Sequence, residues 1–173
     1  MSAPGDPLRS AGADKPFGEW LADTRAAIRG ERDAEVPCGE CTACCTASQF
    51  IHVGPDESET LAVIPREVLF RAPGFPPGHV LMGYDDRGCC PMFKDNECSI
   101  YAHRPRTCRV YDCRVFAAAD VVPDDPEIAA RVRTWRFDHP TPEDVIAHED
   151  VKHRAAADTD PNPTKRAVRA VAG

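Results

Sequence analysis

Apolar residues recur at helical spacing near the amino end of the chain. In the stretch FGEWLADTRAAIRGERDA, residues 17–34, they stand at positions 17, 20, 21 and 28, with alanines between them. This spacing predicts an amphipathic helix, which Pro37 would stop. The residues before it contain no apolar run, so residues 1–16 are expected to be a disordered leader rather than a signal peptide.

The middle of the chain alternates short apolar runs with turn-forming residues. A strand is predicted over 49–53, and a short helix begins at Asp56 or Ser58 and runs through about Val63. Farther on, the sequences DDRG and KDNE separate apolar runs. A small antiparallel meander, whose strand ends contain cysteines, is therefore predicted from three strands: 79–84, 89–93 and 98–101.

Prolines mark the starts of helices toward the carboxyl end. Pro105 is expected to open a short helical stretch that contains Cys108 and Cys113. Three further helices are predicted, over 126–137, 142–157 and 165–171. Trp135 and Phe137 are expected to pack back on the core. The pattern as a whole predicts the α+β class.

Charge and composition exclude some classes of protein. The 173 residues contain 28 acidic and 21 basic side chains, a net charge of −7, which argues against a general binder of nucleic acid or of anionic membranes. No stretch approaches 18 apolar residues, so no membrane span is predicted. Without a span or a signal peptide the expected location is the cytoplasm, where thiols stay reduced.

Cysteines are the unusual feature of the composition. Nine are present, and all lie between positions 38 and 113, namely Cys38, Cys41, Cys44, Cys45, Cys89, Cys90, Cys98, Cys108 and Cys113. They could bind metal, form disulfides, or fill space as small apolar residues. In a reducing compartment, and with an odd count, metal binding is favoured. Thiolates are soft donors that suit zinc and iron–sulfur clusters.

The motif CGECTACC, residues 38–45, leaves the ligand arrangement open. As a helix it would bring Cys38, Cys41 and Cys45 toward one face, with Cys44 pointing away. As a loop it would let Cys38, Cys41 and Cys44 surround one ion or cluster. In both cases the adjacent Cys44 and Cys45 are not expected to enter one site in the same way, so one of them would reach a second metal or bridge two.

The order of the cysteine motifs resembles a known family. CGECTACC at 38, CCPMF at 89, ECSIYAHRPRTCR at 97 and YDC at 111 are similar to the CxxCxxCC cysteine-cluster family, the YkgJ-type proteins described as zinc- or iron-chelating. Cys89 has no counterpart in that pattern. The resemblance implies eight metal ligands: Cys38, Cys41, Cys44, Cys45, Cys90, Cys98, Cys108 and Cys113.

Eight thiolates admit several metal centres. They fit two four-thiolate zinc sites, a two-metal site with bridging thiolates, or one four-iron cluster with extra cysteines. Arg104 and Arg109, which match the family pattern, are expected to offset thiolate charge or to form core ion pairs. Arg106 and Arg114 are expected to be solvated or paired with acidic residues such as Asp112. The six histidines are not expected to be ligands, and those at 139, 148 and 153 are expected on the surface.

Metal binding without turnover is the favoured function. The alternatives are an iron–sulfur protein that moves electrons or supports an enzyme, and a protein-lysine N-methylase, because some longer relatives are described as methylating flagellin. The chain is short and lacks a glycine-rich strand–turn–helix motif, which weighs against the methylase. No catalytic residue is assigned, and a protein partner would use the C-terminal flank. The predicted domains are a metal-binding domain over 17–119 and a flank over 120–173 that packs on the core and ends in a mobile tail.

Overall fold

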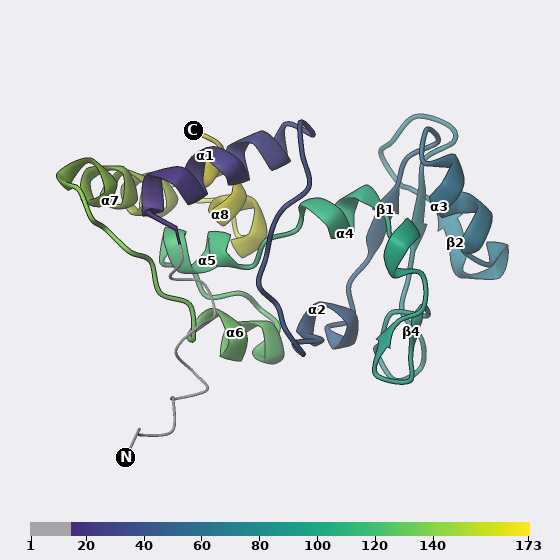
Figure 1. The fold of residues 1–173 in the computed structure, drawn as a ribbon. Helices are drawn as coiled ribbons and strands as arrows, with labels where there is room; N and C mark the ends of the chain where they lie inside the picture. Colours follow the sequence, from purple (N-terminus) through teal and green to yellow (C-terminus); the bar gives the residue numbers. More distant parts are fainter. Residues whose placement is uncertain (1–14) are drawn as a thin grey trace, which may run out of the picture. The chain divides into compact units, whose positions relative to one another are not determined.

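A computed structural model describes residues 15–173, so the predicted leader lies, as far as residue 14, outside the described residues. Short helices and small antiparallel sheets confirm the α+β class. The helices are α1 (Phe17–Ile28), α2 (Ala43–Thr46), α3 (Ser58–Val63), η1 (Arg66–Val68), η2 (Tyr101–His103), α4 (Arg106–Val110), α5 (Arg114–Ala119), α6 (Pro126–Val132), α7 (Pro142–Ala157) and α8 (Pro163–Ala172) (Figure 1). The strands are β1 (Ile51–Val53), β2 (Leu69–Arg71), β3 (Val80–Met82), β4 (Phe93–Lys94) and β5 (Glu97–Cys98).

Contacts divide the chain into two compact units. Unit 1 is Met1–Cys41 together with Asp112–Gly173, and unit 2 is Thr42–Tyr111. The domain boundaries predicted from the cysteine pattern stay a prediction.

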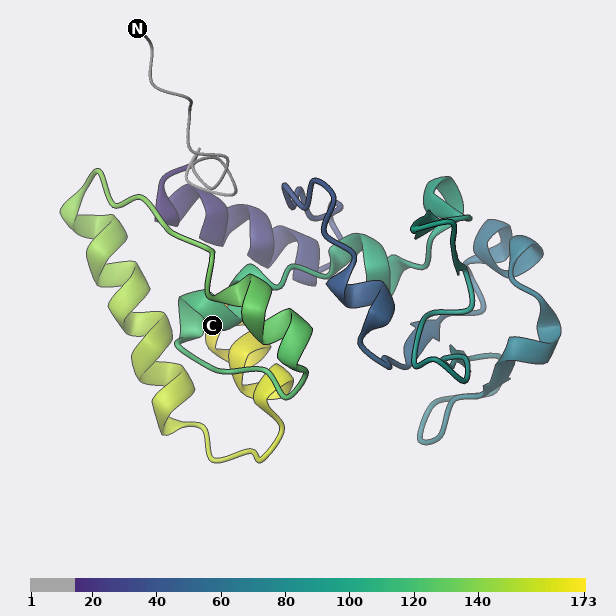
Figure 2. The same cartoon turned by 90° about the horizontal axis from the view of Figure 1, so that it is seen from below.

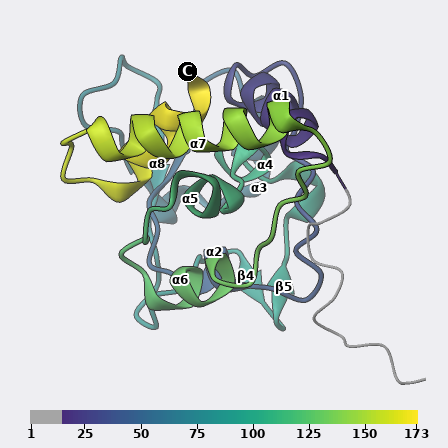
Figure 3. The same ribbon diagram turned by 90° about the vertical axis from the view of Figure 1, so that its left-hand side faces the viewer.

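Unit 1 is helical and is organised around α1, α5, α7 and α8. Helix α5 packs against α7 and α8, and α1 packs against the same two helices (Figures 2 and 3). The core face of α1 contains Phe17, Trp20, Leu21, Thr24 and Ala27, which recur at the three- and four-residue spacing of one helix face. Phe17 stacks on His148 of α7 and contacts Phe137 edge-on, so aromatic rings fill much of this core.

Helix α1 is shorter than predicted. It ends at Ile28 rather than Ala34, because Gly30 adopts a positive φ of 76°. The amide of Gly30 donates to the carbonyl of Ala27 and that of Glu31 to the carbonyl of Ala26, which is the hydrogen-bond pair of a Schellman motif. A glycine at this position is therefore the signal that ends the helix.

Helices α7 and α8 begin where capping residues and prolines coincide. Thr141 accepts from the amide of Asp144, Asp144 accepts in return from the Thr141 amide, and Pro142 occupies the first turn. Helix α7 ends at Ala157, as predicted. Helix α8 starts two residues earlier than predicted, at Pro163, after Asn162 has accepted a hydrogen bond from Lys165. Its buried residues Ala167, Ala170 and Val171 face the rest of unit 1.

Asp144 also ties α7 to α1, because its Oδ1 accepts from the amide of Gly18 at 2.7 Å. We predict that Asp144→Ala lowers the free energy of unfolding of unit 1 by about 2 kcal/mol, since it removes a helix cap and a hydrogen bond between helices. The matched control is Glu143→Ala, which removes an exposed acidic residue of the same turn and should cost no more than about 0.5 kcal/mol. Urea unfolding followed by tryptophan fluorescence measures both, and equal effects would contradict the assignment.

His148 lies in the core rather than on the surface, which corrects the expectation drawn from sequence. The side chain is buried, its ring stacks on those of Phe17 and His139, and its Nδ1 lies 2.7 Å from Nε2 of His139. The sequence pattern was misleading because His148 shares a helix face with the buried Asp144, Val151 and Ala155. Burial, and then the charges of Lys152 and His139, lower the pKa of His148 to about 4.

This buried histidine makes the stability of unit 1 depend on pH. An unfolded histidine takes up its proton near pH 6.5, and the folded one only near pH 4. Stability is therefore complete above pH 6.5 and falls as the pH drops from 6.5 toward 4, by about 2 kcal/mol at pH 5. His148→Gln should remove this dependence of the free energy of unfolding on pH. His153→Gln, at an exposed position, should keep it. Equal slopes in the two variants, measured by urea unfolding between pH 7.5 and 5, would contradict the prediction.

Unit 2 contains two small antiparallel sheets. In the first, β3 lies between β1 and β2, with Ile51 opposite Met82 and Leu69 opposite the same Met82. The second is a hairpin of β4 and β5, turned by Asp95 and Asn96, whose positive φ angles of 50° and 64° match a type I′ turn. A cluster of Val53, Ile64, Met82 and Met92 forms the buried core of this unit.

The predicted meander is wrong in its pairing. The strand predicted at 79–84 pairs with β1 and β2, not with the segment that follows it. Residues 85–89 instead close a tight turn, in which the amide of Asp85 donates to the carbonyl of Cys89. Only the last two predicted strands pair with each other, over Phe93–Lys94 and Glu97–Cys98. In the part of the chain described, no helix is long and apolar enough to cross a membrane.

Candidate metal centre

The nine cysteines are all free thiols, and they fall on both units. Unit 1 contains Cys38, Cys41 and Cys113, and unit 2 contains Cys44, Cys45, Cys89, Cys90, Cys98 and Cys108. Each compact unit therefore has its own set of thiol donors.

In unit 2, backbone hydrogen bonds bring three cysteine segments together. The amide of Cys90 donates to the carbonyl of Cys45, on α2, at 2.7 Å. The carbonyl of Cys90 in turn accepts from Phe93 at 2.9 Å, and Phe93 pairs with Cys98 across the hairpin. Cys90 also packs against the buried core of the unit. Cys45, Cys90 and Cys98 thus belong to one continuous network of backbone contacts.

Helix α4 adds Cys108 to this set. Its start is fixed by Glu57, whose buried carboxylate accepts from the amide of Arg106 at 2.6 Å and from the amide of Gly54 at 2.8 Å. The hydroxyl of Thr107 donates to the carbonyl of His52 on β1. Two successive residues of α4 are therefore bound to the first sheet and the loop after it, directly before Cys108.

The pKa of Cys108 depends on the other three thiols of this set. The pKa of Cys108 is raised to about 12, first by burial and then by Cys90, Cys45 and Cys98, and Arg104 acts in the opposite direction. The pKa of Cys90 is also raised, first by burial, with a contribution from Cys98. Four thiolates so close together are disfavoured without a compensating cation. We call Cys45, Cys90, Cys98 and Cys108 the four-thiol group.

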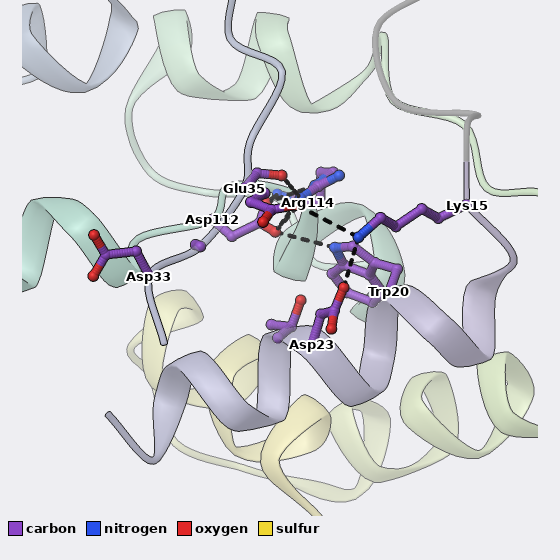
Figure 4. A pocket seen from close by; sticks show the side chains of 9 residues that line it. Lys15, Trp20, Asp23, Asp33, Glu35, Asp112 and Arg114 are labelled. Carbon is purple, nitrogen blue, oxygen red and sulfur yellow. Dashed lines mark hydrogen bonds and ion pairs between the residues drawn. The ribbon is translucent and has the colours of Figure 1, made fainter. Parts of the chain in front are cut away.

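In unit 1, a buried ion pair fixes the backbone on both sides of Cys113. The carboxylate of Asp112 accepts from the guanidinium and the amide of Arg114 and, at 3.0 Å, from Nε1 of Trp20 on α1 (Figure 4). Asp112 and Arg114 are both buried, at 4% and 8% exposed. Because leaving one charge without the other would be costly here, the ion pair holds Cys113 in place against α1.

Two arginines hold the Cys38 segment to the rest of unit 1. Arg114 Nη2 donates to the carbonyl of Glu35 at 2.8 Å. Arg131 Nη2, on α6, donates to the carbonyls of Pro37 and Cys38 at 3.2 and 3.4 Å. The guanidinium of Arg131 also lies over the ring of Trp135, 4.3 Å from its centroid. The chain before Cys41 is therefore attached to α5 and α6 through their arginines.

Trp135 completes the link to Cys113. Its Nε1 donates to the sulfur of Cys113 at 3.1 Å, in the core of the unit. The pKa of Cys113 is raised to about 11, first by burial, although the Trp135 hydrogen bond opposes this, and Cys38 and Cys41 contribute to the rise. The pKa of Cys38 is also raised, first by partial desolvation and then by Cys41, while Arg131 and Arg114 lower it. We call Cys38, Cys41 and Cys113 the three-thiol group.

A comparison with family models identifies the family of the chain. Residues 37–125, more than half of the chain, match the family model CxxCxxCC, described as a "putative zinc- or iron-chelating domain". The chain belongs to the CxxCxxCC family. No match was found among curated proteins or among solved structures. The family domain contains both thiol groups, but Arg131 and Trp135, which hold the three-thiol group, lie after its end.

The donor chemistry of both groups suits the metals named for the CxxCxxCC family. Thiolates are the ligands of structural zinc and of iron–sulfur clusters. Within residues 15–173, no three His, Cys, Asp or Glu side chains stand in an arrangement that could hold a metal ion as they are. The neighbouring thiols nevertheless raise the pKa of Cys108 in one group and of Cys113 in the other, so binding would need local adjustments of side chains within each group.

Two cysteines lie outside the groups. Cys89 belongs to the 85–89 turn, where its amide donates to Asp85 and its sulfur lies near the carbonyl of Arg87. Its omission from the family pattern is consistent with this local role. Cys44 is exposed on α2, next to Cys45 of the four-thiol group. The ligand role of Cys44 stays a prediction, and so does that of the other seven cysteines of the family pattern.

Arg106 and Arg114 pair with acidic residues, as expected. Arg104 lies close enough to lower the pKa of Cys108, and its guanidinium covers the ring of Tyr101. Arg106 pairs with Asp56, at an exposed position. Arg114 pairs with Asp112, and this pair is buried. Sequence reasoning missed Arg131 altogether, because α6 is about ninety residues from Cys38 and no local pattern connects them.

Proposed function

We propose that this chain binds metal through cysteine thiolates in two separate groups, as zinc or as an iron–sulfur cluster. The observation that supports this best is the distribution of the thiols. Four gather in unit 2, where Cys90, Cys45 and Cys98 help to raise the pKa of Cys108, and three gather in unit 1, where Cys38 and Cys41 help to raise the pKa of Cys113. Groups of mutually repelling thiolates gain most from a bound cation, which favours the charged form of all of them at once.

The surroundings of the thiols support the same function. Four thiolates around a divalent metal have a net negative charge, and nearby cationic groups offset it. Arg104 acts on Cys108 in this way, and Arg131 and Arg114 act on Cys38. In addition, Trp135 donates a hydrogen bond to the sulfur of Cys113. This bond favours the thiolate form, because a charged sulfur is the stronger acceptor. Each group thus has its own source of compensating positive charge or hydrogen bonding.

The buried residues near Cys113 favour a structural role over a substrate site. The hollow beside Trp20, Asp112 and Arg114 encloses about 20 Å³, roughly the space of one water molecule (Figure 4). Its charged side chains are largely paired with one another, as in the contact of Lys15 with Asp23 at 2.7 Å. The hollow therefore belongs to the network of contacts that holds Cys113 in place.

Elemental analysis tests the proposal. The full chain is purified anaerobically, and zinc, iron and acid-labile sulfide are measured per chain, with Cys89→Ser as the matched control. We expect metal in both proteins at the same ratio. A variant with both Cys108 and Cys113 replaced by serine should contain little or none. Wild-type protein that retains no zinc or iron after reconstitution would contradict the proposal.

A further inference from the structure

A hollow of about 230 Å³ lies in unit 1 where α5, α7 and α8 pack against one another (Figure 3). None of the side chains that line it is a cysteine. Its apolar wall consists of Ala119 and Val121 at the end of α5 and of Ala155 and Ala156 on α7. The two α7 alanines follow Lys152, which also lines the hollow, by three and four residues, so these three side chains share one face of the helix. The space is much larger than a water molecule needs.

Arg166, on α8, lines this hollow with a guanidinium that has no partner in the protein. Its side chain is half-buried, and its Nε is buried without a hydrogen-bond partner in the part of the chain that the structure describes. By contrast, Arg154 on α7 pairs with Asp150, and Arg169 on α8 pairs with Asp160. Because a buried donor without an acceptor is destabilising, the Arg166 guanidinium would be stabilised by an acceptor that enters the hollow.

The other charged groups at the hollow indicate how much negative charge such a ligand should have. Lys152 pairs with Glu149 at 2.8 Å, which offsets part of its charge, and His153 is exposed. Asp120, which ends α5 in a left-handed conformation with φ of 52°, is exposed at the same hollow. Its carboxylate would repel a second negative charge on the ligand. These charges favour an anion with a single negative charge over a phosphate dianion.

We propose that the hollow between α5, α7 and α8 binds a small organic monocarboxylate, with its carboxylate on Arg166 and its carbon chain against the alanine methyl groups. A guanidinium presents its donors in a planar fork that matches the two oxygens of a carboxylate, and the unpaired Nε of Arg166 is one donor of that fork. The carbon chain would cover Ala119, Ala155 and Ala156, which favours binding through the apolar area removed from water. This site is separate from both thiol groups and needs no metal.

Methyl NMR of the full chain, labelled at alanine, tests the inference. Butyrate serves as the probe, and the methyl resonances of Ala119, Ala155 and Ala156 are followed while inorganic phosphate and butylamine are titrated in parallel. We expect these three resonances to shift saturably with butyrate and to stay unchanged with the other two compounds. No saturable shift with butyrate would overturn the site, and an equal or stronger response to phosphate or butylamine would overturn the assignment of a monocarboxylate.

Three variants locate the binding of butyrate. Arg166→Gln should raise its dissociation constant at least about tenfold, because it removes the charge-assisted hydrogen bonds. The matched control is Lys165→Gln, which removes the same charge from the adjacent exposed position and should change the constant by less than about twofold. Ala156→Leu, at an exposed helical position that tolerates leucine, should fill the hollow and abolish binding while Arg166 stays in place. Equal losses in the Arg166 and Lys165 variants, or undiminished binding in Ala156→Leu, would overturn the inference.

Discussion

Removing the metal from the reduced protein should unfold unit 2 and leave the helices of unit 1 folded. The strands of the first sheet have three residues each, and four buried side chains form the core of unit 2. Such a small core cannot be expected to offset the loss of conformational entropy by itself. Metal–thiolate bonds to the four-thiol group would supply the difference, as they do in small metal-dependent domains.

Unit 1 does not depend on metal to the same degree. Its core contains the large aromatic side chains of Phe17 and Trp20 on α1, of Phe116 on α5, and of Trp135 after the end of α6. The buried Asp112–Arg114 pair and the Asp144 bond to α1 add contacts that need no metal. We therefore expect chelation to loosen the segment around Cys38 while the packing of α1, α5, α7 and α8 persists.

Hydrogen exchange resolved by peptide measures this difference. After treatment with a strong chelator, peptides within 42–111 should lose most of their protection, and those of α1, α7 and α8 should keep theirs. The control is the same protein with zinc restored. Unchanged protection in 42–111 after verified removal of metal would contradict a structural role for the four-thiol group.

Replacing Cys108 should have the largest effect of any single cysteine in unit 2. Its pKa of about 12 means that the metal-free thiol stays protonated at neutral pH, because burial and three neighbouring cysteines disfavour the thiolate. Metal binding must displace this proton, so the affinity of the group should rise with pH up to the pKa and fall as the pH is lowered. Cys108→Ser should weaken binding at the four-thiol group by more than about 100-fold, since even changes around the ligands cost 10- to 100-fold.

Cys89→Ser is the matched control for this substitution. Cys89 is next to Cys90 in sequence, but it belongs to the 85–89 turn, whose hydrogen bonds use its backbone. Its replacement should change the free energy of unfolding by less than about 0.5 kcal/mol and leave metal content unaltered. Competition with a chromophoric chelator between pH 6 and 8.5 measures both variants. Similar losses in the two, or an affinity independent of pH, would count against the four-thiol group.

Local signals predicted the helices well where they were complete. Helix α7 has its predicted bounds because Thr141, Pro142 and Asp144 mark its start unambiguously. Helix α1 was predicted too long because the pattern of apolar residues was given more weight than Gly30. Helix α6 was also predicted too long, to Phe137. It ends at Val132, and the hydroxyl of Thr134 then donates to the carbonyl of Arg131, a local bond that competes with the helix.

Features that depend on distant residues were beyond the sequence. The pairing of β3 with β1 and β2 is set by packing around Val53 and Met82, which no local pattern encodes. The cysteine motifs identified the family, yet they could not divide the thiols between two units. Nor could they reveal that Arg131 and Trp135 reach back to Cys38 and Cys113, because those contacts arise only when α6 and the residues after it fold against α5.

Native mass spectrometry of metal-loaded protein tests the central claim most directly. The claim is that the two thiol groups bind metal separately, so wild-type protein loaded with zinc should contain two ions per chain. Cys113→Ser and Cys108→Ser should each contain one, and Cys89→Ser should contain two. If either single substitution instead removed all of the metal, the thiols would form one shared centre and the account of two separate groups would be wrong.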